Sequence, residues 1–555
     1  MTESPSSPAS IDGAPRLGRL LGLAAVAVGG VAVHLWFIAG ADALDTDRAT
    51  TLLMARQFAE GEFVPYFWAQ NYMGALEPLL MAPLALLGWA TPGVAGLVAL
   101  GLTLVVATCT VRLATRVGAP AWIVVALWAL PSAPVVHHHV SLYGARLAAS
   151  ALVGVALVAS TGGRSRLGWW TLGLLSGLAY FGDHLMLPWA AAVAWVAARR
   201  GGLRPWTWGA LPVVLLDTVL AARTPAYHLS GPNDPFDWLW NLPRLVTVTL
   251  PQLFGLLNSP GPVPIYRAPA SVLPTGWVGW LLLVVGLGTL ATVGRTLVRR
   301  WRAWLGLVGT PEEKCIRQAL ALVVMGTVGL YAFTGGGGDP WTVRYLVPLW
   351  PPLTIWIAWG LGRWPPVRRL ALLGLLLPAA WSLVASEGDW PPRGDDGAVA
   401  RAEAATVQAA LAPHRPAAVW ADYWDTYRLS LHLGEPPPWV PLTVIDRRPE
   451  VRDRAEEAGP AAYLLPGAWV AGQEAVLRGA QASEVAVRAD TTVASYRLVV
   501  TERAVSGVVE RNPSPSRARQ LAAALGAGLL FLMAVAVVAR VAPRVAGRTT
   551  SDTPV

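Results

Sequence analysis

Apolar runs of about the length that crosses a bilayer recur along this chain. Of its 555 residues, 54% are hydrophobic and 14% are charged. A helix of roughly 20 apolar residues spans the hydrocarbon of a membrane, which leaves such runs few other ways to fold. We therefore expect an all-α polytopic membrane protein with about twelve transmembrane helices, near residues 17–40, 93–111, 119–136, 145–161, 167–182, 185–198, 206–222, 276–294, 318–334, 345–361, 369–385 and 519–540.

The positions of the arginines predict how these helices are oriented across the membrane. The net charge is +9, and Lys314 is the one lysine. Because the arginines fall in short clusters between apolar runs, the positive-inside rule explains them better than nucleic-acid binding does. The two cysteines, Cys109 and Cys315, fall on the arginine-rich side and are expected to be reduced thiols. This side is predicted to be cytoplasmic and carries Arg16 and Arg19, Arg112 and Arg116, Arg164 and Arg166, Arg199 and Arg200, Arg295 to Arg302, Arg363 to Arg369, and Arg540 to Arg548.

Residues 386–518 have a different character from the rest. A hydrophilic linker leads into an amphipathic helix at "RAEAATVQAALAPH", and "AAVWADYW", "AAYLLP" and "TTVASYRLVV" are typical of short buried strands. We expect a small exported α/β domain here. The full organisation is then a cytoplasmic tail at 1–16, a transmembrane domain at 17–385 with its first external loop at 41–92, an extracytoplasmic α/β domain at 386–518, a final transmembrane helix at 519–540, and a cytoplasmic tail at 541–555.

The first external loop gathers acids in a chain that is poor in them. Asp42, Asp45 and Asp47 lie within six positions, directly before an amphipathic stretch at 48–60 that is expected to lie along the membrane surface. Asp47 could simply cap that helix. The apolar stretch at 78–89 is too short to span, and we interpret it as a re-entrant or interfacial helix.

The loop resembles a known enzyme family. "GEFVPYFWAQNYMGALEPLLMAPLALLG", "WTVRYLVPLWPPL" and "DYWDTYRLSLHLGE" resemble bacterial GT-C glycosyltransferases of the family-39-like branch, which are related to protein O-mannosyltransferases and lipid A aminoarabinose transferases. The resemblance implies a GT-C-like fold, a polyprenyl-phosphate-sugar donor and an aspartate base in the first external loop. Asp47 matches that aspartate. Arg48 stands where the family often has a glutamate, which leaves Asp45 as the candidate for a second carboxylate.

Sugar transfer from a lipid phosphate explains these residue types. A carboxylate takes the proton of the attacking hydroxyl, while positive groups stabilise the charge that develops on the leaving phosphate. Arg344, beside Tyr345, is the predicted phosphate ligand because a guanidinium fork matches phosphate oxygens. Glu77 could instead cap the helix that begins at Pro78. The predicted substrate-binding residues are Gln70, Tyr72, Glu77, His138, His139, Asp183, His184, Arg344 and Tyr345.

We expect no required cofactor. Asp45 and Asp47 form a D-x-D pattern that could hold a divalent metal, but three residues specify little. The histidines at 137–139 are consecutive and cannot share one helical face, so we predict no metal site there.

The predicted function is that of an integral membrane glycosyltransferase of the bacterial cytoplasmic (inner) membrane. It would move a sugar from a polyprenyl-phosphate carrier in the membrane lipid to a glycan, lipid or protein acceptor on the extracytoplasmic face. Nucleic acid is not an expected partner. The alternative is a lipid-linked glycan flippase or another polytopic transporter, whose charges would be distributed along a path through the bilayer.

Overall fold

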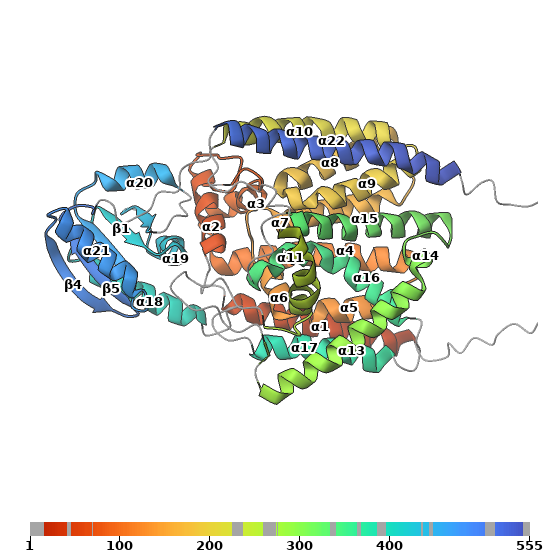
Figure 1. Cartoon of the computed structure of the whole chain (residues 1–555), viewed down its shortest axis with the longest axis horizontal. Coiled ribbons are helices and arrows are strands. Elements are labelled where there is room, and N and C mark those ends of the chain that lie inside the picture. The colour runs from red at the N-terminus through yellow and green to blue at the C-terminus, as the bar shows by residue number, and fades with distance from the viewer. Residues whose placement is uncertain are drawn as a thin grey trace, which may run out of the picture.

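The computed structural model describes residues 16–40, 46–68, 70–224, 237–258, 273–274, 276–333, 340–362, 368–385, 396–434, 437–442, 448–505 and 517–547. Its helices form a long bundle, and a small α/β domain lies at one end of that bundle (Figure 1). The short helices α2 and α3 lie between the two parts. A mostly helical membrane protein with one small sheet domain was the predicted fold class, and the structure confirms it.

The helices of the bundle follow the apolar runs closely. Their bounds are α1 (Arg16–Ala39), α2 (Thr46–Ala59), α3 (Leu76–Leu86), α4 (Pro92–Arg116), α5 (Ala121–Ala129), α6 (Ala133–His139), α7 (Arg146–Ser160), α8 (Arg166–Gly182), η1 (His184–Met186), α9 (Leu187–Arg199), α10 (Leu203–Arg223), α11 (Asp237–Arg244), η2 (Leu245–Thr249), α12 (Leu250–Leu253), α13 (Gly276–Arg299), α14 (Trp301–Trp304), α15 (Pro311–Phe333), η4 (Pro340–Leu349), α16 (Trp350–Leu361), α17 (Arg368–Ala385) and α22 (Arg517–Gly547).

The described helices differ in how well they could cross a membrane. Six are long and apolar enough by length and composition, and α5 with α6 would make a seventh if the pair, bent by 87°, forms one span. Others, such as α7 and α17, are apolar but shorter. The count of twelve crossings therefore stays a prediction, although each apolar run does contain helix.

The α/β domain is a five-stranded mixed sheet flanked by helices. The strand order is β2-β1-β3-β5-β4, with β1 parallel to β2 and β3, and β5 antiparallel to both β3 and β4. Its elements are α18 (Asp396–Leu411), β1 (Ala418–Ala421), α19 (Tyr423–Leu433), β2 (Trp439–Pro441), α20 (Pro449–Glu456), β3 (Ala461–Pro466), α21 (Val470–Ala482), β4 (Val487–Val493) and β5 (Tyr496–Thr501).

Two of the predicted strands differ from the structure, one by ending early and the other by forming two strands. The strand predicted in "AAVWADYW" stops at Ala421, because the Asp422 carboxylate accepts a hydrogen bond from the Trp424 amide and starts helix α19. The segment "TTVASYRLVV" forms a hairpin, because the chain turns at Ala494, where φ is 51°.

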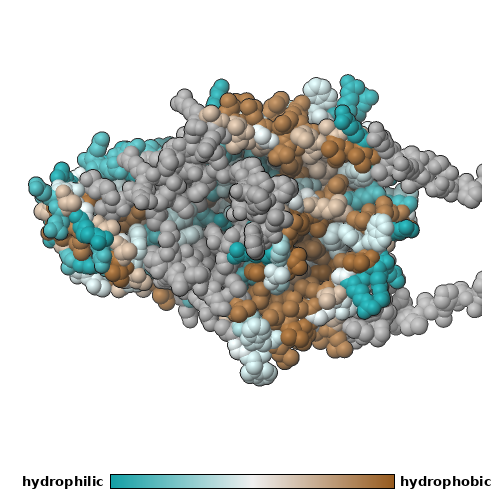
Figure 2. Space-filling model, in the orientation of Figure 1, coloured by the Kyte–Doolittle hydropathy of each residue, from teal (hydrophilic) through white to brown (hydrophobic). Residues whose placement is uncertain are grey.

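The arginine-rich connections meet at the end of the bundle away from the α/β domain. Arg116 donates to the Val158 carbonyl at the end of α7, and Arg199 donates to the Ala542 carbonyl near the end of α22. Figure 2 shows hydrophilic patches at this end and on the α/β domain, with hydrophobic surface over the bundle between them. This grouping fits the positive-inside pattern, and which end is cytoplasmic stays a prediction.

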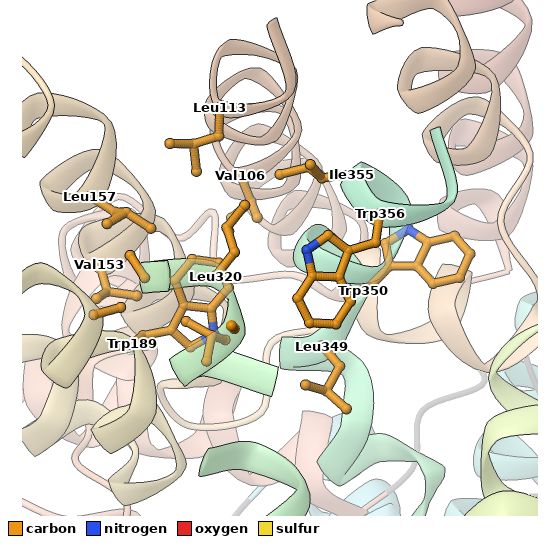
Figure 3. Packing of buried hydrophobic residues seen from close by; sticks show 14 of the residues in the cluster. Val106, Leu113, Val153, Leu157, Trp189, Leu320, Leu349, Trp350, Ile355 and Trp356 are labelled. Carbon is orange, nitrogen blue, oxygen red and sulfur yellow. The ribbon is translucent and has the colours of Figure 1, made fainter. Parts of the chain in front are cut away.

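The main core lies along the bundle. Figure 3 shows Trp189 and Leu320 near Val153, with Trp350 beside Trp356 and Ile355 in the same cluster. Helices α8 and α10 approach so closely that their backbones touch. A Cβ on Gly173 would lie 1.9 Å from the Trp206 carbonyl oxygen. Small residues are common where helices contact each other in membranes. The hydrophobic effect contributes little to helix association in lipid, and small residues let the helices approach closely enough for van der Waals packing.

Candidate active site

Helix α2 carries Asp47 across the end of the bundle. Thr51, on the bundle side of α2, donates to the Leu142 carbonyl and accepts from the Gly144 amide. Its opposite side packs against Tyr423 and Tyr427 of α19. The predicted helix is therefore present, but it differs from an open surface helix because both of its sides are covered.

Asp47 forms an ion pair with the other predicted key residue. The Arg344 Nη1 lies 3.2 Å from the Asp47 Oδ2, across 297 positions of sequence. Both side chains are partly exposed, at 14% for Asp47 and 18% for Arg344. Neither side chain is therefore fully enclosed by the protein. The structure thus brings together the predicted base and the predicted phosphate ligand.

A tyrosine lies between two guanidinium groups. Arg344 donates to the Tyr345 hydroxyl at 3.0 Å, and its Cζ is 4.9 Å from the centre of the Tyr345 ring. Arg146, the first residue of α7, lies 5.2 Å from the same ring. The Arg146 Nε donates to Asp183 Oδ2 at 2.8 Å in a buried ion pair. Two cations therefore flank one aromatic ring, which is favourable because the ring faces carry negative charge density.

A small cavity of about 20 Å³ opens beside Arg146. Its walls include polar groups from three segments: His138, Ser141, Ser150 and Arg146, closed by Val347 and Pro348 next to Arg344 and Tyr345. The Ser141 hydroxyl is buried and has no hydrogen-bond partner among the described residues. A buried hydroxyl of this kind needs a partner. The cavity therefore suits a water molecule or one oxygen atom of a polar ligand.

The three consecutive histidines point to three different places. His137 hydrogen-bonds to the Tyr143 hydroxyl, and His138 lines the cavity. His139 stacks on Trp128 and hydrogen-bonds to His34 of α1 at 3.3 Å, inside the bundle. Of the two predicted substrate ligands, His138 is thus placed at the site, whereas His139 packs between helices.

Asp183 and His184 belong to two neighbouring ion pairs, in which Asp183 and Asp217 are buried and His184 is partly exposed. Asp183 pairs with Arg146 and also caps η1 by accepting from the Leu185 amide. His184 lies 3.0 Å from the Asp217 carboxylate of α10, which also accepts a 2.6 Å hydrogen bond from the Tyr66 hydroxyl. Asp183 is therefore part of the polar interior and contacts the site through Arg146, whereas His184 lies at its edge.

The loop between α2 and α3 lies against the start of η1. The Tyr72 carbonyl accepts from the His184 amide, and Tyr72 also interacts electrostatically with Arg344. Gly74 donates its amide to Phe181, and a Cβ on Gly74 would lie 2.6 Å from that ring. Gln70 is in the same loop, and its Oε1 is buried without a partner among the described residues. Tyr72 therefore lies near Arg344, and contact of Tyr72 or Gln70 with substrate stays a prediction.

Glu77 is fully buried and caps a helix other than its own. Its Oε1 accepts from the amides of Leu147 and Ala148, at 2.7 and 3.2 Å, in the first turn of α7. Burial raises the pKa of Glu77 to about 7. Arg146 immediately precedes Leu147 in this first turn of α7. By binding the turn, Glu77 therefore also fixes the position of Arg146 at the site. Its predicted contact with substrate stays a prediction.

The second carboxylate and the metal remain untested. Asp42 and Asp45 lie outside the described residues. The structure therefore describes neither the predicted second carboxylate, Asp45, nor the complete D-x-D pattern. Within the described ranges, no three His, Cys, Asp or Glu side chains gather in a way that could hold a metal ion.

Sequence reasoning missed two residues of this region, Arg146 and Asp217. Arg146 had a signal: it begins an apolar run on the side where the other connections lack clusters of arginine. Asp217 had one too, because it is an acid inside the apolar run 206–222. An ionisable residue within a membrane helix is a functional candidate by default.

Comparison with known proteins identifies the fold. No protein-family model matches the chain, and no curated protein matches it. The structure of ArnT from Cupriavidus metallidurans in the apo state matches with a TM-score of 0.53 and 13% identity, over 87% of this chain and 98% of that one. The chain has the ArnT fold. A second ArnT structure, bound to undecaprenyl phosphate, gives a TM-score of 0.46 and 12% identity, over 89% of this chain and all of that one.

This match confirms the fold that the sequence resemblance implied. Lipid A aminoarabinose transferases are among the GT-C enzymes that the first loop resembles, and ArnT is one of them. At 13% identity the likeness concerns the arrangement of helices and the sheet domain. The chemistry has to be argued from the residues of the site.

Proposed function

We propose that this protein is a membrane glycosyltransferase that uses a polyprenyl-phosphate-linked sugar as donor. The observation that carries the proposal is the pairing of Asp47 with Arg344 at the end of the bundle, at 3.2 Å and with both side chains accessible. A base and a phosphate ligand are the two groups that the reaction needs, and the ArnT fold supports this use of them.

In the proposed reaction, the acceptor hydroxyl attacks the anomeric carbon of the sugar. Asp47 accepts the hydroxyl proton as the new carbon–oxygen bond forms, and the bond from the anomeric carbon to the phosphate oxygen breaks. Arg344 stabilises the charge that develops on the leaving phosphate, as a guanidinium does well. The ion pair with Arg344 orients Asp47 before substrate arrives.

The cavity beside Arg146 supports a place for the phosphate. Arg146, His138 and Ser141 lie on its walls, the Ser141 hydroxyl has no hydrogen-bond partner among the described residues, and both Arg146 and Arg344 lie within 5.2 Å of the Tyr345 ring centre. A phosphate at its mouth could receive hydrogen bonds from both guanidinium groups, with one oxygen directed toward Ser141. The acceptor would then approach from the Asp47 side, beneath the α/β domain. An extracytoplasmic location for this face belongs to the same proposal.

The test is sugar transfer by purified protein in lipid nanodiscs. Radiolabelled polyprenyl-phosphate hexoses and pentoses serve as donors, and membranes from cells lacking the protein supply the acceptor. We expect transfer by the wild type and a loss of at least 100-fold in Asp47→Asn. The control is Asp490→Asn, which changes an exposed acid on the outer strand of the sheet. Movement of labelled lipid between leaflets without transfer would instead identify a flippase, and full activity of Asp47→Asn would exclude Asp47 as the base.

A further inference from the structure

Helix α19 of the α/β domain contacts α2 at both of its ends. At the first end, the Thr46 hydroxyl lies 2.9 Å from the carbonyl oxygens of both Tyr423 and Trp424. At the other end, Arg56 donates to the Leu431 carbonyl at 3.2 Å. The two helices therefore run side by side in the same direction, with the start of one facing the start of the other.

These contacts lie next to the reacting group. Thr46 is the first residue of α2 and immediately precedes Asp47. Its side chain is fully buried. The Leu431 carbonyl lies in the last turn of α19, where carbonyls have no helical donor, so Arg56 supplies one. Along the length of this contact, Tyr423, Tyr427 and Leu431 pack against the side of α2 that faces away from the bundle.

Helix α19 is itself held rigidly within its domain. Arg428 donates to Glu403 of α18 at 2.9 Å, to Asp425 at 2.8 Å, and to the Tyr496 hydroxyl of β5 at 2.7 Å. The guanidinium thus connects α19 to a flanking helix and to the sheet. A hydrogen bond from Thr46 to α19 therefore fixes α2 against a framework that is not part of the bundle.

We propose that α19 is a positioning element of the active site, and that the Thr46 hydroxyl is the group through which it holds Asp47 in line with Arg344. The α/β domain would then act in catalysis by fixing the base, in addition to any contact with acceptor. The kinetic consequences of this inference rest on the proposed glycosyl transfer. The structural part, that Thr46 anchors the start of α2, is independent of the reaction.

Thr46→Val tests the proposal because it removes the hydroxyl and keeps the shape. Thr46→Ser keeps the hydroxyl. The matched control is Thr50→Val, one turn further along α2, where the hydroxyl is buried without a partner among the described residues. We expect Thr46→Val to lower kcat for sugar transfer about tenfold with KM for the donor within twofold, because small misplacements of a reacting group are costly. Thr46→Ser and Thr50→Val should stay within twofold of wild type in both constants.

Hydrogen–deuterium exchange of the same full-length proteins in nanodiscs gives a second readout that needs no activity. Thr46→Val should speed amide exchange in the peptide that covers the first turns of α2, while Thr50→Val and Thr46→Ser should not. Unchanged exchange and unchanged kcat in Thr46→Val would overturn the proposal, and so would a change confined to KM. If the wild type transfers no sugar, the proposed function fails, and the exchange result alone decides whether α19 anchors α2.

Discussion

Glu77→Gln should make the protein less sensitive to rising pH. The wild-type carboxyl is fully buried, with one oxygen bound to two amides of α7 and the other, Oε2, without a partner among the described residues. Burial raises its pKa from 4.5 to about 7. Above pH 7 the native state must therefore hold a charge that the unfolded chain holds easily in water.

The sign and size of the effect follow from linkage. Below pH 4.5 the carboxyl is protonated in both states and costs nothing. As the pH rises from 4.5 to about 7, the unfolded state loses its proton first, and the free energy of unfolding falls by about 3 kcal/mol, at 1.36 kcal/mol for each pH unit. Glutamine stays neutral and can still accept from both amides, so the variant lacks this loss.

The assay is the apparent Tm in nanodiscs at a fixed heating rate, from pH 5 to pH 8.5. The wild type should lose a few degrees more than Glu77→Gln over this range, since 1 kcal/mol moves the Tm of a domain of 150–250 residues by about 2–4 °C. The control is Glu62→Gln, an exposed acid in the loop after α2. Equal pH dependence in wild type and Glu77→Gln would refute the reasoning, as would the same change in the Glu62 control.

Three further predictions follow from contacts described above. Arg344→Lys keeps the charge but loses the guanidinium fork, so kcat/KM for sugar transfer should fall about 100-fold in the nanodisc assay, with unchanged Tm. Gly173→Ala should lower the apparent Tm by the equivalent of about 1–3 kcal/mol, because its Cβ would meet the α10 backbone, whereas Gly101→Ala, with open space around it, should not. Asp217→Ala should lower the free energy of unfolding by about 1–3 kcal/mol, because the partly exposed His184 loses its carboxylate partner while Tyr66 keeps only the backbone carbonyl of residue 217, and a loss under about 0.5 kcal/mol would contradict the pairing.

The fold was largely predictable because its main signal is local. An apolar run marks a helix wherever the run lies, so most helices of the bundle were predicted, with ends that differ by up to seven residues, whereas α11, η2, α12 and α14 lie outside the predicted runs. The helix at α2, the short helix at α3 and most of the sheet strands were also found from short patterns. The bend between α5 and α6 was not found, since the apolar run continues through it while the chain turns by 87°.

The site was less predictable because it depends on pairs far apart in sequence. Asp47 and Arg344 were each found by resemblance, but their contact across 297 positions could not be. Glu77 illustrates the difficulty. A capping role was considered for its own helix, whereas the structure shows it capping α7. Arg146 was overlooked because its role depends on Asp183 and Tyr345, which no spacing places beside it.

The three histidines of α6 carry a consequence for how this segment can change over evolution. Neighbouring residues on a helix point about 100° apart, and His137, His138 and His139 face three unlike surroundings: a tyrosine hydroxyl, a polar cavity and a stacked indole. A single inserted or deleted residue would rotate all three at once and leave each in its neighbour's place. A substitution would therefore change one of these contacts, whereas a change in the length of the segment would change all three.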